Sequence, residues 1–372
     1  LERLNHSYGK SFPDIARAIL GQFPNPPDLV AFPKSTSDVI RTLDWANDNS
    51  IAVIPYGGGS SVCGGVETDV GESYAGVISM DLRKMNQVIE IDRISRAARV
   101  EAGILGPDLE NQLKEYDLTL RHFPQSFEHS TLGGWIATRS GGHYATLYTH
   151  IDDFVESTTS ATPSGLIESR RLPGSGAGPS PDRMIIGSEG ILGVITQAWV
   201  RLQDRPRYRS SCSVRFLDYS EALNATRLIS QSALFPANCR LLDANEANFH
   251  GAGDGSKHLL IIGFESANHD MKPWLDRALE ILESHGGEFE FPKTGHGEAR
   301  KQGSSGSWRS SFMKAPYYRE AFIRRGIVQD TFETSITWDK GFEFIETLKK
   351  KTSDAIEEIT KKKTTATIFL LL

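Results

Sequence analysis

Apolar and polar positions along the N-terminal part of the chain follow both the helical and the strand period. Helical spacing is clearest at 14–20 and 35–46, and a further short helix is expected to open at Gly106. Runs of apolar and β-branched residues predict strands at 29–33, 51–54, 76–81, 88–92, 98–103 and 194–202. The two periods mix without a repeated βαβ unit. This order predicts an α+β layered domain rather than a doubly wound sheet.

The C-terminal part shows a second mixed pattern. Strands are expected at 212–216, 239–243, 258–264, 330–338 and 364–372, and helices at 219–234, 273–285, 342–360 and in the second half of 301–325. This pattern predicts a smaller α+β domain with an antiparallel sheet. The boundary is placed at Arg205-Pro206-Arg207, which interrupts the pattern. The predicted domains are therefore 1–205, which begins with a helical lead-in, and 206–372.

A glycine-rich turn follows the strand at 51–54. Gly57, Gly58 and Gly59 are consecutive, so this turn lacks Cβ atoms and can bring its N–H groups close to a ligand. Converging N–H groups bind anions, and the hydroxyls of Ser60 and Ser61 add donors. The turn matches neither GxGxxG nor a P-loop. A pyrophosphate site is one interpretation, and a glycine hairpin without a ligand is the alternative.

Two further glycine-rich segments lie in the same domain, at 124–144 and 184–196. The third passes directly into an expected strand, and Ser130-Thr131 in the second can cap a short helix. One large ligand that touches all three turns through the backbone is the simplest explanation for them. FAD, a flat dinucleotide, meets this requirement.

Charge and cysteine content exclude several classes of protein. The chain has 372 residues and a net charge of -6, which argues against a general nucleic-acid binder. Its three cysteines lie far apart and form no CxxC pair, so neither a disulfide framework nor a metal site is expected. No apolar run is long enough to span a membrane, and no targeting segment is visible. A cytoplasmic location is therefore expected, although the chain does not begin with Met.

Three stretches of the sequence are similar to a known family: "LNHSYGKSFPD" at 4–14, "STLGGWIATRSGG" at 130–142 and "DTFETSITWD" at 330–339. Together with the glycine turns, they resemble alkyldihydroxyacetonephosphate synthase-like members of the FAD-binding vanillyl-alcohol-oxidase/PCMH superfamily. The resemblance implies a PCMH-type FAD-binding domain of two α+β subdomains, followed by an α+β substrate-binding cap with an antiparallel sheet.

The resemblance also implies which residues bind FAD. The first turn would hold the pyrophosphate, and the second and third segments would line the flavin. The implied cofactor-binding residues are Pro55, Tyr56, Gly57, Gly58, Gly59, Ser60, Ser61, Pro124, Ser126, Ser130, Thr131, Gly134, Thr138, Arg139, Ser140, Gly141, Gly187, Glu189, Gly190, Gly193, Val194 and Ile195.

Two single residues receive specific interpretations. Superfamily members with covalent FAD carry the linking His in their first glycine turn, which has no His here, so non-covalent FAD is expected and His143 is not expected to be the link. Arg240 occupies the position of an arginine that is important for activity in the synthases, and it is the predicted catalytic residue. The alternative for Arg240 is an ion pair with a neighbour such as Asp243.

The activity implied by the resemblance is the exchange of the acyl chain of acyl-dihydroxyacetone phosphate for a fatty alcohol through a flavin N5 adduct, a step of ether lipid synthesis. An FAD-dependent oxidase or dehydrogenase of D-2-hydroxy acids or related alcohols is the first alternative, and a non-catalytic flavin-binding protein the second. The triple-histidine motif, catalytic tyrosine and phosphate-binding arginine of the synthases do not appear after 364–372. A longer natural chain is therefore expected.

The partner implied is a lipid-like phosphorylated small molecule. Peripheral contact with a membrane, through lysines at 349–351 and 361–363, and a peroxisomal location in a eukaryote are compatible with the resemblance. A homodimer is compatible with the sequence as well.

Overall fold

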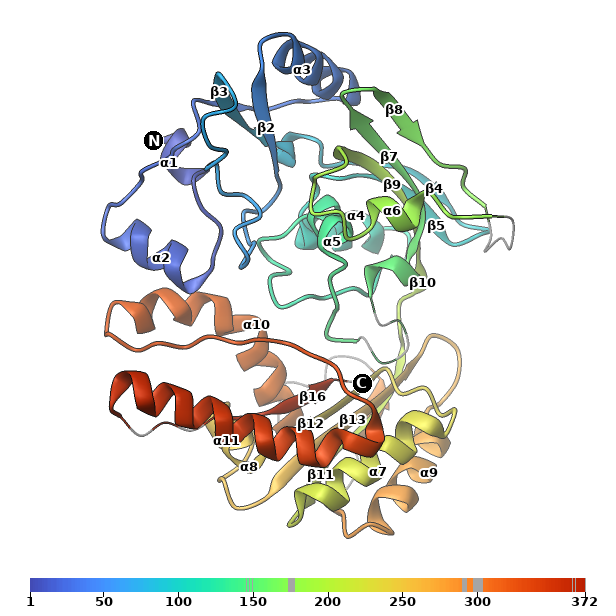
Figure 1. Ribbon diagram of the computed structural model, residues 1–372. Coiled ribbons are helices and arrows are strands. Elements are labelled where there is room, and N and C mark those ends of the chain that lie inside the picture. The colour runs from blue at the N-terminus through green and yellow to red at the C-terminus, as the bar shows by residue number, and fades with distance from the viewer. Residues whose placement is uncertain are drawn as a thin grey trace. The chain divides into compact units, whose positions relative to one another are not determined.

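The computed structural model describes residues 1–144, 146, 148, 150–172, 178–289, 293–296, 304–362, 364 and 366–371. Its elements form two compact units (Figure 1). The first unit comprises Leu1–His143, His150–Asp204 and Ala315–Asp330. The second comprises Tyr144–Thr149, Arg205–Lys314 and Thr331–Leu372.

The first unit begins with two short helices and a parallel sheet. The helices are α1 (Glu2–Asn5) and α2 (Phe12–Ile19), and the strands are β1 (Leu29–Ala31), β2 (Ile51–Tyr56) and β3 (Gly76–Asp81) in the order β1-β3-β2. Helix α3 (Thr36–Asp48) connects β1 to β2 and begins at Ser35, whose side chain accepts a hydrogen bond from the N–H of Asp38. Val39 and Leu43 of α3 are buried with Met80 of β3, which fixes the helix near the sheet.

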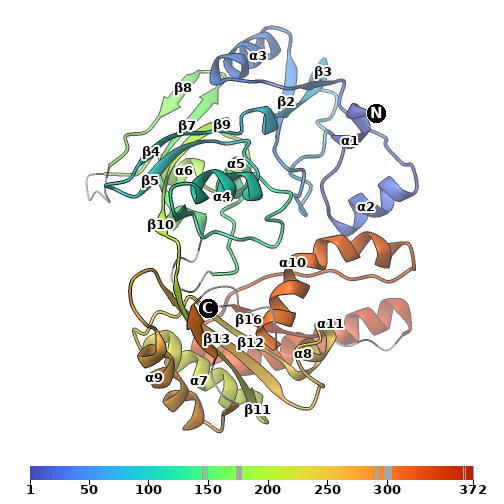
Figure 2. The same ribbon diagram turned by 180° about the vertical axis from the view of Figure 1, so that it is seen from behind.

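A five-stranded antiparallel sheet forms the other half of this unit, in the order β4-β5-β9-β7-β8 (Figure 2). Its strands are β4 (Val88–Asp92), β5 (Ala97–Glu101), β7 (Val155–Thr162), β8 (Gly165–Glu168) and β9 (Val194–Arg201). The smaller elements are η1 (Leu82–Lys84), α4 (Gly106–Lys114), β6 (Leu118–Thr119), α5 (Leu132–Thr138), η2 (Ile151–Asp153), α6 (Asp182–Ile185) and β10 (Gln203–Asp204), which pairs with β6. Contacts between α5 and β9 place the short helix beside this sheet.

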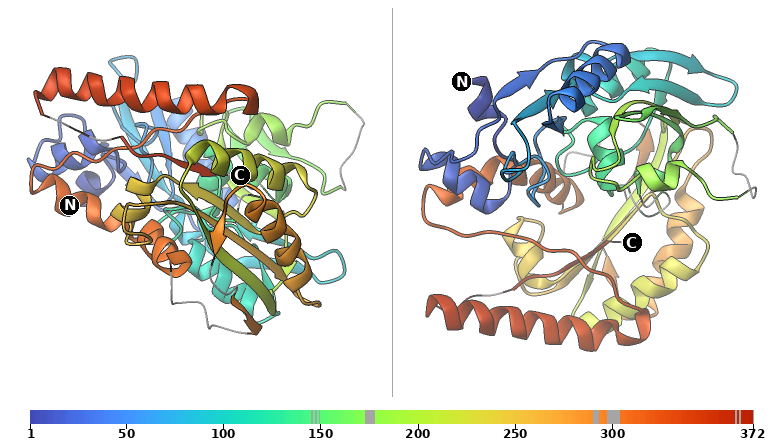
Figure 3. Two further views of the ribbon diagram at one scale, coloured as in Figure 1. Left: turned by 90° about the horizontal axis from the view of Figure 1, so that it is seen from below. Right: turned by 45° about the horizontal axis from the view of Figure 1, so that its top comes forward.

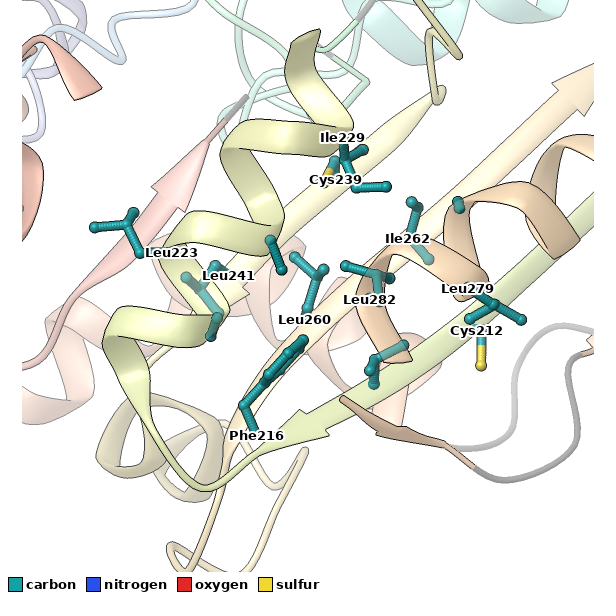
Figure 4. Close-up of a cluster of buried hydrophobic side chains, with 14 of the residues drawn as sticks. Cys212, Phe216, Leu223, Ile229, Cys239, Leu241, Leu260, Ile262, Leu279 and Leu282 are labelled. Atoms are coloured by element: carbon teal, nitrogen blue, oxygen red, sulfur yellow. The ribbon is translucent and has the colours of Figure 1, made fainter. Parts of the chain in front are cut away.

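The second unit is built on an antiparallel sheet in the order β14-β11-β13-β12-β16, with β15 also paired to β11. Its strands are β11 (Tyr208–Phe216), β12 (Asn238–Leu242), β13 (His258–Ser266), β14 (Glu288–Phe289), β15 (Lys293–His296) and β16 (Phe369–Leu371). Helices α7 (Tyr219–Gln231) and α9 (Lys272–Glu283) pack on one face, where Phe216, Leu241 and Leu260 are buried (Figure 4). Helix α8 (Ala244–Phe249) packs on Leu242, Leu259 and Ile261 instead.

The remaining elements are α10 (Ser304–Ile323), η3 (Trp338–Lys340) and α11 (Gly341–Thr360). Figure 3 shows α11, in red, as one uninterrupted helix. Its buried residues, Gly341 and Ile345, lie in its first turns. Within the described residues, no helix combines the length and the apolar character needed to cross a bilayer.

The structure confirms the predicted fold class: two α+β units, of which the second contains an antiparallel sheet. The strand predicted at 330–338 is wrong. Residues 330–337 form no regular element, and the alternating pattern there reflects exposed side chains rather than a sheet face. The strand predicted at 364–372 is confined to Phe369–Leu371, which pairs with β12. The roles of the two units, as FAD-binding domain and as cap, stay predictions from the sequence.

Candidate functional site

The three glycine-rich segments of the first unit converge. The N–H groups of Gly187 and Glu189 donate to the carbonyls of Ile136 and Ala137 at 2.9 Å, which joins the third segment to helix α5. A Cβ on Gly58 would lie 1.5 Å from the carbonyl oxygen of His129, so the first turn contacts the second segment closely. These contacts support the interpretation that the segments serve one site.

The first turn also contacts the third segment directly. A Cβ on Gly190 would lie 3.3 Å from Cγ of Pro55, the residue before the end of β2. A Cβ on Gly65 would lie 3.4 Å from the carboxylate of Glu189. All three segments therefore lie within van der Waals reach of one another, although they are far apart in the sequence.

The backbone of the first turn has donors available for a ligand. Within the part of the chain that the structure describes, the N–H groups of residues 58–61 donate to no protein acceptor. Gly58, Ser60 and Ser61 are half-buried, and Gly59 is buried. Backbone N–H groups withdrawn from water normally have an acceptor, and an anion would supply one for this turn.

The second segment uses its polar groups differently. The Ser130 hydroxyl donates to the Ser126 carbonyl at 2.8 Å and accepts from Nε1 of Trp135 at 2.6 Å. Thr131 is the N-cap of α5, and its hydroxyl accepts from the N–H of Gly134 at 3.3 Å. Ser130 and Thr131 are both buried, and their hydroxyls are engaged in hydrogen bonds within the segment.

The other predicted residues of this segment differ in their exposure. Pro124 is buried and Ser126 is half-buried, whereas Gly134 and Thr138 keep part of their surface on the outer side of α5. The hydroxyl of Thr138 donates to the carbonyl of Gly134, at 3.0 Å, so this polar group is satisfied within the helix.

Arg139 ends α5 in the left-handed conformation, with φ of 51°. Its guanidinium donates to Asp152 at 2.8 Å, and Arg183 donates to the same carboxylate oxygen at the same distance. Burial opposes the ionisation of Asp152, but these arginines outweigh it and lower the pKa of the carboxyl. The side chain of Arg139 also fills the space beside Gly187, so its visible role is to join the second and third segments.

His122 and Ser140 form a buried polar contact under the same segment. Nε2 of His122 lies 2.8 Å from the Ser140 hydroxyl, and its ring lies 5.2 Å from that of Trp135. Burial, assisted by the charge of His150, lowers the pKa of His122 to about 3, so its imidazole is neutral at physiological pH. His143 is also buried, and its N–H donates to the carbonyl of Phe123 at 2.8 Å.

The third segment contributes exposed apolar surface. Ile191 and Leu192 are 84% and 40% exposed. Val194 and Ile195 begin β9 and are buried, with their backbones paired to Ala161 and Ser160 of β7. Of the predicted residues here, Gly187, Glu189 and Gly190 therefore keep accessible surface, whereas Val194 and Ile195 do not.

The site as a whole fits FAD. The first turn provides N–H donors for a pyrophosphate, and α5 with the third segment provides a glycine-rich, partly apolar surface for a ring system. No lysine or arginine is needed at the pyrophosphate when backbone dipoles supply the positive potential.

Arg240 lies in the second unit, on strand β12, and is 1% exposed. It follows Cys239, which faces the α7 and α9 side of the sheet, so Arg240 points to the opposite side. Burial lowers the pKa of Arg240 to about 10, while the neighbouring Cys239, Tyr144 and Glu333 favour its charged form. Asp243, the partner considered above, accepts from Lys349 at 2.9 Å.

Comparison with known proteins identifies the family. Residues 27–169 match the family model described as FAD binding domain, and residues 205–368 match FAD linked oxidases, C-terminal domain. A solved structure of alkyldihydroxyacetonephosphate synthase, in space group P1, is 30% identical with a TM-score of 0.81, over 96% of this chain and 71% of that chain. The chain belongs to the alkyldihydroxyacetonephosphate synthase family.

Two named relatives in this synthase family support the assignment. The alkyldihydroxyacetonephosphate synthase of Dictyostelium discoideum is 38% identical over 69% of this chain and 42% of the relative. That of Trypanosoma brucei brucei is 27% identical over 96% of this chain and 60% of the relative. The chain thus spans about half the length of these relatives. Membership in this synthase family confirms both the predicted resemblance and FAD as the cofactor.

Sequence reasoning missed two buried histidines of this unit. His6 lies in the lead-in stretch that carried the family resemblance, but it received no role of its own. His122 precedes Pro124 by two residues and was not a candidate either. The signal that could have flagged both is a titratable residue beside a predicted cofactor segment, although a histidine is equally common in a plain core.

Proposed function

We propose that this chain is an FAD-dependent enzyme that exchanges the acyl chain of acyl-dihydroxyacetone phosphate for a fatty alcohol. Its family membership supports this reaction class, and the relatives are named for the product of that reaction. The substrate would be a lipid-like phosphorylated molecule, and the reaction would belong to ether lipid synthesis.

The observation that carries the proposal is the first glycine turn, where the N–H groups of residues 58–61 find no acceptor within the described residues. In our proposal these groups bind the FAD pyrophosphate, Gly134 and Thr138 lie along the flavin, and Gly187, Glu189 and Gly190 contact its other side. The remaining predicted residues of the three segments support this surface. When bound, FAD would supply the group that holds the substrate covalently during the exchange.

Arg240 is proposed to bind an anionic group of the substrate. Its near-complete burial supports this role, because a guanidinium withdrawn from water favours an anion as its partner. Arg240→Lys would keep the charge but lose the planar fork that binds two oxygens at once. We expect this variant to bind FAD normally and to exchange acyl for alkyl chains at a rate lower by about 100-fold.

Two measurements test the proposal. The purified chain is reconstituted with FAD and its visible spectrum recorded; it is then incubated with acyl-dihydroxyacetone phosphate and labelled hexadecanol. We expect a yellow protein, label in the alkyl product and flavin that ends oxidised. A protein that stays colourless after reconstitution would overturn the assignment of the site, and a yellow protein without label transfer would overturn the reaction.

One observation favours a second function, oxidation of a D-2-hydroxy acid or related alcohol. Residues 205–368 match a domain family named for FAD linked oxidases. A dehydrogenase would bleach the flavin when its substrate is added without oxygen, whereas the exchange reaction leaves the flavin oxidised. The same reconstituted sample therefore distinguishes the two functions.

We further propose that FAD is held non-covalently, since the first turn contains no histidine. Denaturation in acid should then release all of the yellow colour into the supernatant. A peripheral membrane contact and a cytoplasmic or peroxisomal location stay proposals, and flotation with anionic vesicles would test the contact.

A further inference from the structure

The N-terminal segment before β1 packs on the first glycine turn. The backbone N–H of Lys10 donates to the carbonyl of Ser61 at 2.6 Å, and a Cβ on Gly9 would lie 2.2 Å from that oxygen. The hydroxyl of Tyr56, the last residue of β2, donates to the carbonyl of Asn5 at 3.2 Å. The segment therefore contacts the turn just before its first glycine and again at Ser61.

His6 is the buried centre of this contact, with 1% of its surface exposed. Its Nδ1 lies 2.7 Å from the carbonyl oxygen of Glu2, and its Nε2 lies 3.1 Å from Oδ2 of Asp81. A carbonyl and a carboxylate only accept hydrogen bonds, so both ring nitrogens must donate. Only the imidazolium form of His6 has two N–H groups, which means that this geometry is complete when His6 is charged.

The carboxylate partner is held ionised by a second cation. Asp81 accepts from Nε of Arg83 at 3.0 Å and from the Arg83 backbone N–H at 2.9 Å. Burial opposes ionisation of Asp81, but the hydrogen bonds from Arg83 and His6 outweigh it and lower the pKa of this carboxyl. Asp81 thus lies between two cationic donors at the end of β3.

The other groups that face His6 are consistent with a charged ring. The carboxylate of Glu2, on α1, lies 3.8 Å from Nδ1 and adds negative potential. The ring of Tyr56, on β2, lies 4.5 Å from the His6 ring, and that of Phe32 lies 5.9 Å away. The Tyr56 ring is tilted by 53° to the imidazole, and the two rings pack together. Among the described neighbours, Arg83 is a cation that opposes the charge, and Asp81 lies between them.

The register of the sheet connects this cluster to the turn. Asp81 and Tyr56 are paired at the ends of β3 and β2, and Gly57 follows Tyr56 directly. A Cβ on Gly59 would overlap the Tyr56 hydroxyl, at 1.9 Å, so the turn folds back over this ring. The N–H groups of residues 58–61 therefore belong to a turn that packs directly against Tyr56 and the N-terminal segment.

We propose that His6, as an imidazolium, is a positioning residue for the pyrophosphate-binding turn, and that FAD affinity depends on its charge. The inference rests on the proposed binding of FAD at this turn. It places a functional residue outside residues 27–169, the part matched by the FAD binding domain family.

The test compares FAD binding by three forms of the chain: wild type, His6→Gln and, as a control, His269→Gln, which changes an exposed histidine of the second unit. Dissociation constants are measured from flavin fluorescence across a pH series, and the protonation of His6 is followed by ¹⁵N NMR of labelled histidine. We expect His6→Gln to bind FAD about tenfold more weakly, the cost of one charge-assisted hydrogen bond. The control should match wild type.

The pH series distinguishes a positioning role of the His6 charge from a purely structural role of this residue. The dissociation constant of wild type should rise as NMR shows His6 losing its second proton, whereas that of His6→Gln should stay flat. If His6→Gln does not fold, the wild-type series alone decides. An affinity that does not change while His6 loses its proton, or a His6 that stays neutral across the whole pH series, would overturn the inference. A wild type that binds no FAD at any pH would instead overturn the proposed function.

Discussion

The first and second glycine-rich segments are alike in composition and opposite in use. Both are rich in Gly, Ser and Thr. In the first, the N–H groups of residues 58–61 have no acceptor among the described residues. In the second, Ser130, Thr131 and Ser140 bond to neighbouring side chains or backbone. A polar group that the protein already satisfies builds the scaffold, and one left unsatisfied at the surface is available to a ligand.

The largest expected effect comes from adding a methyl group where the two segments touch. Gly58→Ala would place its Cβ 1.5 Å from the His129 carbonyl oxygen. Because this oxygen belongs to the backbone, a change of side-chain rotamer cannot remove the clash. We expect a loss of about 3 kcal/mol in unfolding free energy. FAD affinity should fall by about 100-fold as the turn shifts. Urea unfolding and flavin fluorescence measure the two effects.

Gly71→Ala is the control for that variant. Gly71 has a positive φ, of 70°, and nothing lies within 4 Å of the position that an added methyl group would take. The cost should be about 1 kcal/mol, from backbone strain alone, with unchanged FAD affinity. Equal effects of the two substitutions on FAD affinity would contradict a tight contact between the segments.

The second prediction concerns the effect of pH on His122, which contacts Ser140 of the second glycine-rich segment. Burial lowers the pKa of His122 to about 3 in the folded state, whereas an unfolded histidine titrates near 6.5. The unfolded chain therefore binds the proton first, and stability is lost as pH falls from about 6.5 toward 3. Between pH 7 and pH 4.5 the loss from this residue should be about 2–3 kcal/mol.

His122→Gln should remove this loss while keeping a hydrogen bond to Ser140. Urea unfolding at the two pH values, for wild type and variant, gives the difference directly. His285→Gln, a change in the second unit, serves as control for the general effect of acid. If wild type and His122→Gln lost the same unfolding free energy between pH 7 and 4.5, the pKa of His122 would not be lowered in the folded protein.

A third prediction sharpens the contrast at single hydroxyls. Ser130→Ala removes the acceptor of the buried Trp135 N–H, which lies 2.6 Å from it. An unsatisfied buried donor costs about 2 kcal/mol of unfolding free energy. FAD affinity of the folded protein should change by less than about twofold, because the hydroxyl faces the interior. Thermal unfolding of the apoprotein and FAD titration report the two quantities.

Ser60→Ala should give the opposite result and the smallest effect. The Ser60 hydroxyl is half-buried and makes no hydrogen bond within the described residues, so its removal should cost less than about 0.5 kcal/mol of stability. FAD affinity should fall by about fivefold, the value of one neutral hydrogen bond. If Ser130→Ala weakened FAD binding more than Ser60→Ala did, the division between scaffold and ligand surface would be wrong.

Much of this architecture follows from patterns in the sequence. Capping residues such as Ser35 and Thr131 identified helix starts, because a hydroxyl before an apolar-periodic run satisfies the first free N–H groups. The α+β class followed from the way stretches with the helical period and stretches with the strand period succeed one another without a repeated βαβ unit. The pattern at 330–338 misled, because alternation reports only that every second residue is apolar and not that a partner strand exists.

Within the site, the sequence located the segments but not the roles of single residues. Ser60 and Ser130 cannot be distinguished by type or by neighbours, and only the fold shows that one is half-buried at the turn and the other bonded to Trp135. His6 was missed for a related reason. Its partner Asp81 lies 75 positions away, and their proximity follows from tertiary structure alone.

The assignment of Ala315–Asp330 to the first unit has a consequence for synthesis of the chain on the ribosome. The contacts that this segment makes with the first unit cannot form until Arg205–Lys314 has been translated. Cutting the gene after residue 204 would therefore yield a first half without these contacts.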